Sequence, residues 1–259
     1  MPENKHATSW FTTEGSAFPL GATWVADEGA YNFALYSKHA TAVTLLLFRE
    51  EAPHAPVLEL ALDHKINKSG RIWHCRLPRA TMRDATHYAY RVDGPEGGSD
   101  YGLHAFDADK VLLDPYARQV WFPPGFQREA AMQPGSNMGR APLGVLFEEH
   151  AEFDWGDDTV RFHEHDLVIY EMHVRGFTRN PNSGVAAERA GTFLGVVDKI
   201  PHLQELGVTA VELLPVHQFD PQENNYWGYM TLNFFAPHTG YAVDPDRAFD
   251  EFRTMVKAL

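Results

Sequence analysis

The sequence is poor in cysteine and has no long apolar run. Cys75 is the only cysteine among 259 residues, so no disulfide can form within the chain, and a reducing, cytoplasmic location is expected. No stretch approaches the length of a membrane span, and residues 1–10 lack the apolar region of a secretory signal. We therefore expect no membrane partner.

Basic side chains are also scarce. Lys and Arg total 22 against 35 Asp and Glu, which gives a net charge of −13 and argues against nucleic acid as a partner. No glycine-rich phosphate loop of a common pattern occurs. His163, Glu164 and His165 offer metal ligands, but without a further ligand nearby they make a poor zinc motif. We expect no cofactor and no metal, and neutral ligands such as sugars remain open.

Short apolar runs dominate the first hundred residues. They recur at regular intervals, separated by Ser, His, Pro and Gly: YNFALY (31–36), VTLLLF (43–48), VLELAL (57–62), RIWHCRL (71–77) and HYAYRV (87–92). This spacing predicts an antiparallel β-sandwich over residues 1–100. A turn-rich segment over 101–165 is expected to connect two domains, although its part 112–122 is too apolar for a free linker and should pack against one of them.

Residues 166–259 change to a pattern of buried strands and helices. LVIY (167–170) is a continuous apolar run, typical of a parallel strand that is covered on both faces. The alternation after it predicts that Glu171, His173 and Arg175 share one strand face. We interpret this polar face as a hydrogen-bonded network, with a polar shell near a ligand as the alternative.

Helical spacing follows this strand. Thr192 is a candidate N-cap of a helix that Pro201 should split or kink. VTAVELLPV (208–216) is then a second buried strand, so the two strands and the helix should form a βαβ unit. Asp244 can cap a final helix, with Pro245 at its first position.

Eight short motifs occur in order along the chain. They are GATW (21–24), YNFALYSKHATAVTLLLF (31–48), YRVDGP (90–95), KVLLDPYAR (110–118), FDWGDD (153–158), VIYEMHVRGFT (168–178), GTFLGVVDKIPHLQELGVTAVELLPV (191–216) and NYWGYMTLNFFAPHTGY (225–241). In this order and spacing they resemble the isoamylase-type branch of the α-amylase superfamily, above all the bacterial glycogen debranching enzymes.

The resemblance implies a multidomain fold of β plus α/β class. A carbohydrate-binding, early-set β-sandwich over 1–100 and a connecting segment over 101–165 precede the first two β/α units of a (β/α)8 TIM barrel over 166–259. A complete barrel needs about 250 residues, so we expect a truncated one. Its unpaired strand edge and uncovered inner face predict self-association, or a partner chain that completes the barrel.

The resemblance also implies hydrolysis of α-1,6-glucosidic branch linkages in an α-glucan such as glycogen, amylopectin or limit dextrin. The paired carboxylic acids of this family follow later barrel strands, so no catalytic residue is carried over and the isolated chain is expected to be inactive. A non-catalytic α-glucan-binding or interaction protein is the alternative. Within the family, a glucan branching enzyme or a maltooligosyl trehalose hydrolase is also possible.

One aromatic loop carries the implied substrate contact. In the resembled family the last tyrosine of YWGY stacks on the sugar next to the cleaved bond, which assigns this role to Tyr229. Trp227 and Tyr226 flank it, and for these two we favour packing of the loop over a sugar contact. Aromatic residues on the sandwich strands are assigned to the core, so no sugar site is predicted there.

Overall fold

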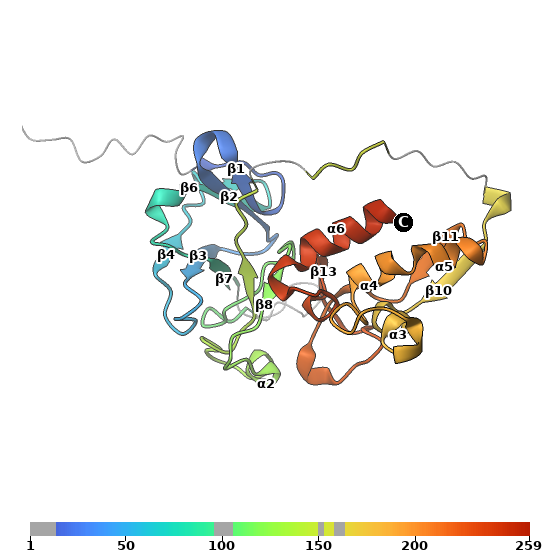
Figure 1. Ribbon diagram of the computed structural model, residues 1–259. Coiled ribbons are helices and arrows are strands. Elements are labelled where there is room, and N and C mark those ends of the chain that lie inside the picture. Colours follow the sequence, from blue (N-terminus) through green and yellow to red (C-terminus); the bar gives the residue numbers. More distant parts are fainter. Residues whose placement is uncertain (1–13, 96–105, 150–152, 158–163) are drawn as a thin grey trace, which may run out of the picture. The chain divides into compact units, whose positions relative to one another are not determined.

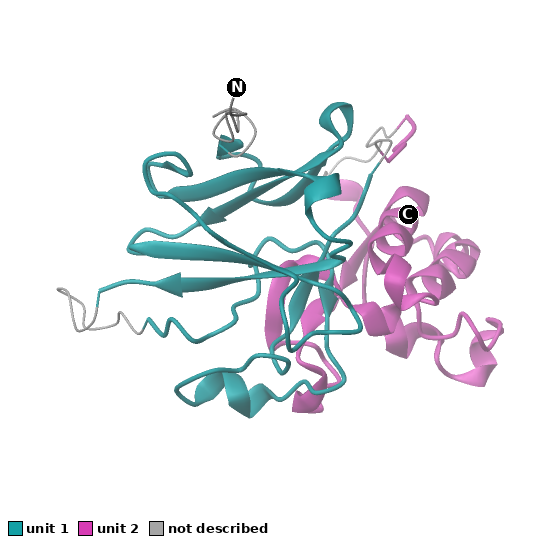
Figure 2. Ribbon diagram, turned by 90° about the vertical axis from the view of Figure 1, so that its left-hand side faces the viewer, with its two compact units in different colours: residues 1–150 teal, residues 151–259 magenta. Residues whose placement is uncertain are grey.

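The computed structural model describes residues 14–95, 106–149, 153–157 and 164–259 (Figure 1). The chain divides into two compact units, Met1–His150 (unit 1) and Ala151–Leu259 (unit 2), which Figure 2 shows in different colours. Residues 1–13 and His163 lie outside the described residues, so the expectations for them stay predictions. Within the described ranges, no helix combines the length and apolar character that crossing a bilayer requires.

Unit 1 contains two antiparallel sheets. The first has the order β1(Gly21–Val25), β2(Ala30–Tyr36), β6(Ile72–Pro78), β5(Lys68–Ser69). The second has the order β4(Leu58–Ala61), β3(Ala42–Phe48), β7(His87–Asp93), β9(Leu143–Val145), β8(Val120–Trp121). The turn η1(Ala26–Glu28) connects β1 to β2, the turn η2(Arg79–Thr81) connects β6 to β7, and helix α2(Arg128–Met132) lies between β8 and β9. All five strands predicted from the apolar runs are confirmed.

The two sheets enclose one core, which makes unit 1 a sandwich. Alternate side chains of β2 and β6, including Phe33 and Trp73, pack against Leu45, Tyr88 and Tyr90 of the facing sheet. Every one of these side chains is almost fully buried. The assignment of the strand aromatics Trp73, Tyr88 and Tyr90 to the core is therefore confirmed.

The segment expected to connect the domains is part of the sandwich instead. Strands β8 and β9 extend the second sheet through pairing of β9 with β7, and Leu112 forms a bridge with Tyr90. Val111 and Leu143 are buried in a cluster with Leu46. The strand content was missed because β8 and β9 have two and three residues, too few to show an alternating pattern.

Unit 2 is built around two parallel strands. β10(Ile169–Met172) pairs in register with β11(Ala210–Leu213). Between them lie α3(Val174–Thr178), η4(Pro181–Ser183), α4(Phe193–Asp198) and α5(Ile200–Glu205), and η3(Glu164–Asp166) precedes them. After them come β12(His217–Phe219), η5(Pro221–Glu223), β13(Thr231–Pro237), η6(Thr239–Tyr241), η7(Pro245–Arg247) and α6(Ala248–Ala258). β12 and β13 form an antiparallel pair that the sequence did not predict.

The predicted helix signals in unit 2 are confirmed. The Thr192 hydroxyl accepts a hydrogen bond from the Gly195 amide at 3.2 Å and caps α4. Pro201 lies in the first turn of α5, so the predicted helix is split in two at Lys199. Asp244 caps the turn η7, which begins with Pro245 and leads into α6.

Two expectations for the first strand of unit 2 were wrong. Tyr170 and Met172 pack on the unit 2 core, but Ile169 is 59 % exposed, because the described residues place no layer against that face. The strand ends at Met172 and α3 begins at Val174. Glu171, His173 and Arg175 therefore do not share a strand face.

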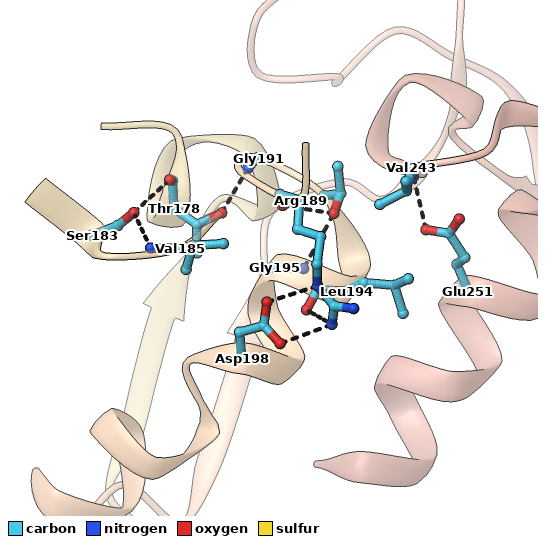
Figure 3. A network of polar contacts seen from close by, with 11 residues as sticks. Thr178, Ser183, Val185, Arg189, Gly191, Leu194, Gly195, Asp198, Val243 and Glu251 are labelled. Carbon is cyan, nitrogen blue, oxygen red and sulfur yellow. Dashed lines mark hydrogen bonds and ion pairs between the residues drawn. The ribbon is translucent and has the colours of Figure 1, made fainter. Parts of the chain in front are cut away.

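A polar network fixes the loop between α3 and α4 (Figure 3). The Thr178 hydroxyl accepts from the Gly191 amide at 2.7 Å. Arg189 forms two hydrogen bonds with the Asp198 carboxylate, at 2.7 and 2.8 Å, and its guanidinium also donates to the Leu194 carbonyl. Gly195 is required at the α4 N-terminus, since a Cβ there would lie 2.2 Å from the Arg189 carbonyl oxygen. The network holds α4 in place over β10 and β11.

Candidate functional site

The candidate site of unit 2 lies in the loop between β12 and β13, next to the C-terminal end of β10. The loop carries the three aromatic residues predicted from the sequence: Tyr226, Trp227 and Tyr229 are 52, 53 and 65 % exposed. Gly228 has φ +77°, and a Cβ there would meet the Phe219 ring at 3.1 Å. The glycine therefore permits the turn that separates Trp227 from Tyr229.

His173 binds both the backbone and the side chain of this loop. Its Nδ1 accepts from the Gly176 amide at 3.0 Å, which places the proton of the neutral ring on Nε2. Nε2 therefore donates to the Tyr226 carbonyl at 2.8 Å and lies 3.1 Å from the Tyr241 hydroxyl. The Tyr226 ring stacks on the imidazole, with centroids 4.4 Å apart and planes at 9°. One histidine thus fixes both the backbone and the side chain of Tyr226.

The other two aromatics are held less closely. Trp227 makes edge contacts with the rings of Tyr226 at 5.6 Å and His173 at 6.1 Å. Tyr229 is the most exposed of the three. A half-exposed ring on a fixed loop offers an apolar face to a ligand, and this arrangement suits the apolar side of a sugar ring.

Buried polar residues that the sequence reasoning missed lie beneath the loop. The Gln218 amide donates to Nδ1 of His238 at 2.9 Å and to the Phe219 carbonyl at 2.8 Å. Burial, with added repulsion from Arg175 and His173, lowers the pKa of His238 to about 4. Burial also raises the pKa of Tyr241 to about 12. His238 and Tyr241 are therefore neutral at physiological pH and contribute hydrogen bonds rather than charge.

Two carboxylates face each other on the parallel strands. Glu171 of β10 and Glu212 of β11 are register partners, and neighbouring strands are about 4.8 Å apart. This spacing is close to that of a retaining glycosidase pair. Both side chains are exposed to solvent, however, whereas a catalytic acid relies on enclosure to keep its proton. The described residues therefore form no enclosed acid–base pair at these two positions.

Among the described residues, no group of three or more His, Cys, Asp or Glu side chains is arranged to hold a metal ion. Cys75 is buried, and burial raises the pKa of its thiol to about 12. A thiolate therefore does not form there at neutral pH.

Known proteins match both units of the chain. The model of carbohydrate-binding module 48, the isoamylase N-terminal domain, matches residues 19–117. Isoamylase 3 of Oryza sativa subsp. japonica is 43 % identical over 95 % of the chain and 33 % of its own length. The glycogen operon protein GlgX homolog of Mycobacterium tuberculosis is 37 % identical over 95 % of the chain and 35 % of its own length.

Solved structures share the fold. The catalytic module of the glycogen-degrading pneumococcal virulence factor SpuA superimposes with a TM-score of 0.69 at 23 % identity, covering 96 % of the chain and 37 % of that structure. A pullulanase from Paenibacillus barengoltzii gives a TM-score of 0.67 at 23 % identity, covering 95 % of the chain and 36 % of that structure.

The sandwich of unit 1 thus matches carbohydrate-binding module 48, the isoamylase N-terminal domain. The whole chain is homologous to isoamylases and GlgX proteins, and it matches the N-terminal portion of these relatives. It spans about a third of the length of the curated relatives it matches.

Proposed function

We propose that the chain is the N-terminal part of an α-glucan debranching glycoside hydrolase, which cleaves α-1,6 branch linkages of glycogen or a related polymer. The observation that carries this proposal is homology to isoamylases and GlgX proteins over 94–96 % of the chain. Residues 166–259 then supply the first two β/α units of a barrel. The parallel pair of β10 and β11, with helices between them in sequence, supports this assignment.

In this proposal Tyr229 stacks on a glucose ring, and Trp227 and Tyr226 shape the loop around it. Its exposure of 65 % and the fixed turn at Gly228 support the role. Binding of maltotriose to the wild-type chain and to Tyr229→Ala tests it. We expect about tenfold weaker binding by the variant, because aromatic contacts of this kind contribute about 1 kcal/mol or more. Unchanged affinity would remove Tyr229 from the substrate contact.

The 259-residue chain by itself is proposed to be inactive. The exposed position of Glu171 and Glu212 supports this, since neither carboxyl group lies in an enclosed environment. Release of reducing ends from amylopectin is the measurement, with Glu171→Gln and Glu212→Gln as matched variants. We expect no release from any of them. Hydrolysis by the wild-type chain that either substitution abolishes would show that this pair is catalytic.

The second candidate is a non-catalytic α-glucan-binding protein. The module match over residues 19–117 favours it, because this unit alone accounts for a binding role. Retardation in a native gel containing glycogen, combined with absence of hydrolysis after addition of the C-terminal part of a GlgX protein, would support the binding protein. Recovery of debranching in that mixture would support the enzyme. A branching or trehalose-releasing product would reassign the bond specificity within the family.

We further propose that exposed apolar side chains of unit 2 are covered by another polypeptide or by a second copy of the chain. Val168, Ile169, Phe234 and Phe235 are each more than half exposed, and such apolar side chains are candidates for an interface. Light scattering should detect self-association of the isolated chain, and a monodisperse monomer would contradict it. A cytoplasmic location stays part of the proposal, supported by the single buried thiol at Cys75.

A further inference from the structure

Unit 1 contains a groove that the sequence did not predict. Its volume is about 930 Å³, within the range of small-molecule sites. It forms where the end of β2, strand β7, the segment 106–115 and the end of α2 meet, and every lining residue belongs to unit 1. The described lining of the groove therefore involves no residue of unit 2.

Exposed apolar side chains concentrate at this groove. The described part of unit 1 exposes four large hydrophobic residues, and three of them line the groove: Tyr36, Leu112 and Met132, with exposures of 49, 41 and 63 %. The fourth, Phe18, is 66 % exposed and does not line it. These three residues come from separate segments of the chain, so their convergence is a property of the tertiary structure. Such gathering of exposed apolar surface marks a binding site.

The apolar residues stand on fixed backbone. Leu112 is held by reciprocal backbone hydrogen bonds with Tyr90, at 3.0 and 2.8 Å. The buried ammonium of Lys110 donates to the carbonyl of Ala130 at 2.7 Å and to the carbonyl of Gln133, and so ties the end of α2 to the neighbouring segment. The surface is therefore preformed, and binding costs little ordering.

The rim of the groove is polar and negatively charged. Asp93 and Asp107 line it, together with Ser37 and Gln133. The backbone amides of Gly135 and Asp109 donate hydrogen bonds to the Asp107 carboxylate and lower its pKa. The carboxylate is therefore ionised at neutral pH. Carboxylates accept hydrogen bonds from hydroxyl groups but repel anions, and the chain carries a net charge of −13. A neutral ligand with many hydroxyl groups and an apolar face fits this chemistry.

We propose that this groove is the α-glucan-binding site of unit 1, which rests on the proposed function of the chain. The apolar faces of glucose rings lie on Tyr36, Leu112 and Met132, and sugar hydroxyls donate to Asp93 and Asp107. The site is separate in sequence from the aromatic loop of unit 2. Because Tyr229 does not line the groove, binding of a glucan chain by unit 1 should not require it.

Calorimetric titration with maltoheptaose tests the proposal on the full 259-residue chain. All variants carry Tyr229→Ala, so that binding at the loop of unit 2 does not mask the groove. We expect Tyr36→Ala to weaken binding at least about tenfold and Asp107→Asn several-fold. Phe18→Ala is the matched control, because Phe18 is an even more exposed aromatic of the same unit that does not line the groove, and its affinity should stay within about twofold of the background.

Far-UV circular dichroism and thermal unfolding establish that each variant is folded. Met132→Ser replaces Tyr36→Ala as the decisive variant if the latter does not fold, since Met132 is exposed on a short helix. Equal affinity of the groove variants and the control overturns the groove, while the proposed function stands. If the wild-type chain binds neither maltoheptaose nor glycogen, the proposed carbohydrate-binding role of unit 1 also fails.

Discussion

Tyr88 and Asp114 form a buried pair whose contribution to stability should depend on pH. The Tyr88 hydroxyl donates to the Asp114 carboxylate at 2.9 Å, and the Tyr116 amide donates to it at 2.8 Å. Burial raises the pKa of Asp114 from 3.8 to about 6, and these two hydrogen bonds limit the rise. Because the folded state binds this proton more tightly than the unfolded state, the stabilisation is fully present below pH 3.8. It is lost as pH rises through 6, by about 3 kcal/mol in total.

Substituting Tyr88→Phe removes a donor to a carboxylate that is ionised at pH 8 and mostly protonated at pH 5. A hydrogen bond to a charged group contributes about 2 kcal/mol, and one to a neutral group about 1 kcal/mol. The free energy of unfolding of unit 1 should therefore fall by about 2 kcal/mol at pH 8 and by about 1 kcal/mol at pH 5. The difference between these two costs corresponds to a further rise of about one unit in the pKa of Asp114 when the Tyr88 hydroxyl is removed.

The control is Tyr90→Phe, two residues along the same strand. Tyr90 is equally buried, and its hydroxyl has no hydrogen-bond partner among the described residues. This substitution should change stability by less than about 0.5 kcal/mol, or stabilise unit 1 slightly. Both variants lose one phenolic oxygen, but only Tyr88→Phe removes the hydrogen bond to Asp114 and the contact of the hydroxyl with the Ala22 backbone.

Urea unfolding followed by pulsed hydrogen exchange, measured on peptides from β3 and β7, reports unit 1 separately from unit 2. The comparison of variant with wild type at each pH also removes the effect of His87. Burial lowers the pKa of His87 to about 4, so its stabilisation is lost as pH falls through 4, opposite to that of Asp114. If Tyr88→Phe costs the same free energy at both pH values, or if Tyr90→Phe costs as much as Tyr88→Phe, the hydrogen bond to Asp114 is not the cause of the loss.

Three further predictions concern unit 2 and use the same exchange measurement on peptides from β10 and α6. Thr192→Ala should cost about 1 kcal/mol through loss of the α4 cap, whereas Thr192→Ser should be nearly neutral; equal costs would exclude capping as the cause. Phe193→Ala should cost about 3–5 kcal/mol, because this fully buried ring packs on Tyr241 and Phe252, and unit 1 should be unaffected. His238 contributes stability that is present above pH 6.5 and lost as pH falls through 4, so His238→Gln should flatten the acid dependence of unit 2.

Five sandwich strands, β2, β3, β4, β6 and β7, could be predicted because each has four or more residues within an apolar run. β8 and β9 could not, since two or three residues carry no period and their place is set by pairing with β7. Asp114 shows the same limit. Its burial beside Tyr88 depends on how the segment after β7 folds back, and nothing in its neighbours along the chain indicates it.

The candidate site was predicted in part. The motif YWGY located Tyr226, Trp227 and Tyr229, because a short motif fixes residues within one loop. The alternating pattern of residues 171–175 predicted one polar strand face, and this prediction was wrong because the strand ends before His173, which is the N-cap of α3. Its contact with Tyr241 spans 68 residues of sequence, and the pattern of a single segment cannot show a contact of that range.

The sequence by itself indicated the homology to isoamylases, the order of the main strands and helices, the helix start at Thr192, the helix interruption at Pro201 and the capping role of Asp244. These features depend on local spacing and on side chains that bond to their own backbone. Only the tertiary structure decided which surfaces form. It gathered Tyr36, Leu112 and Met132 into one groove and placed His173 under the aromatic loop, because chain segments far apart in sequence meet only when the core packs.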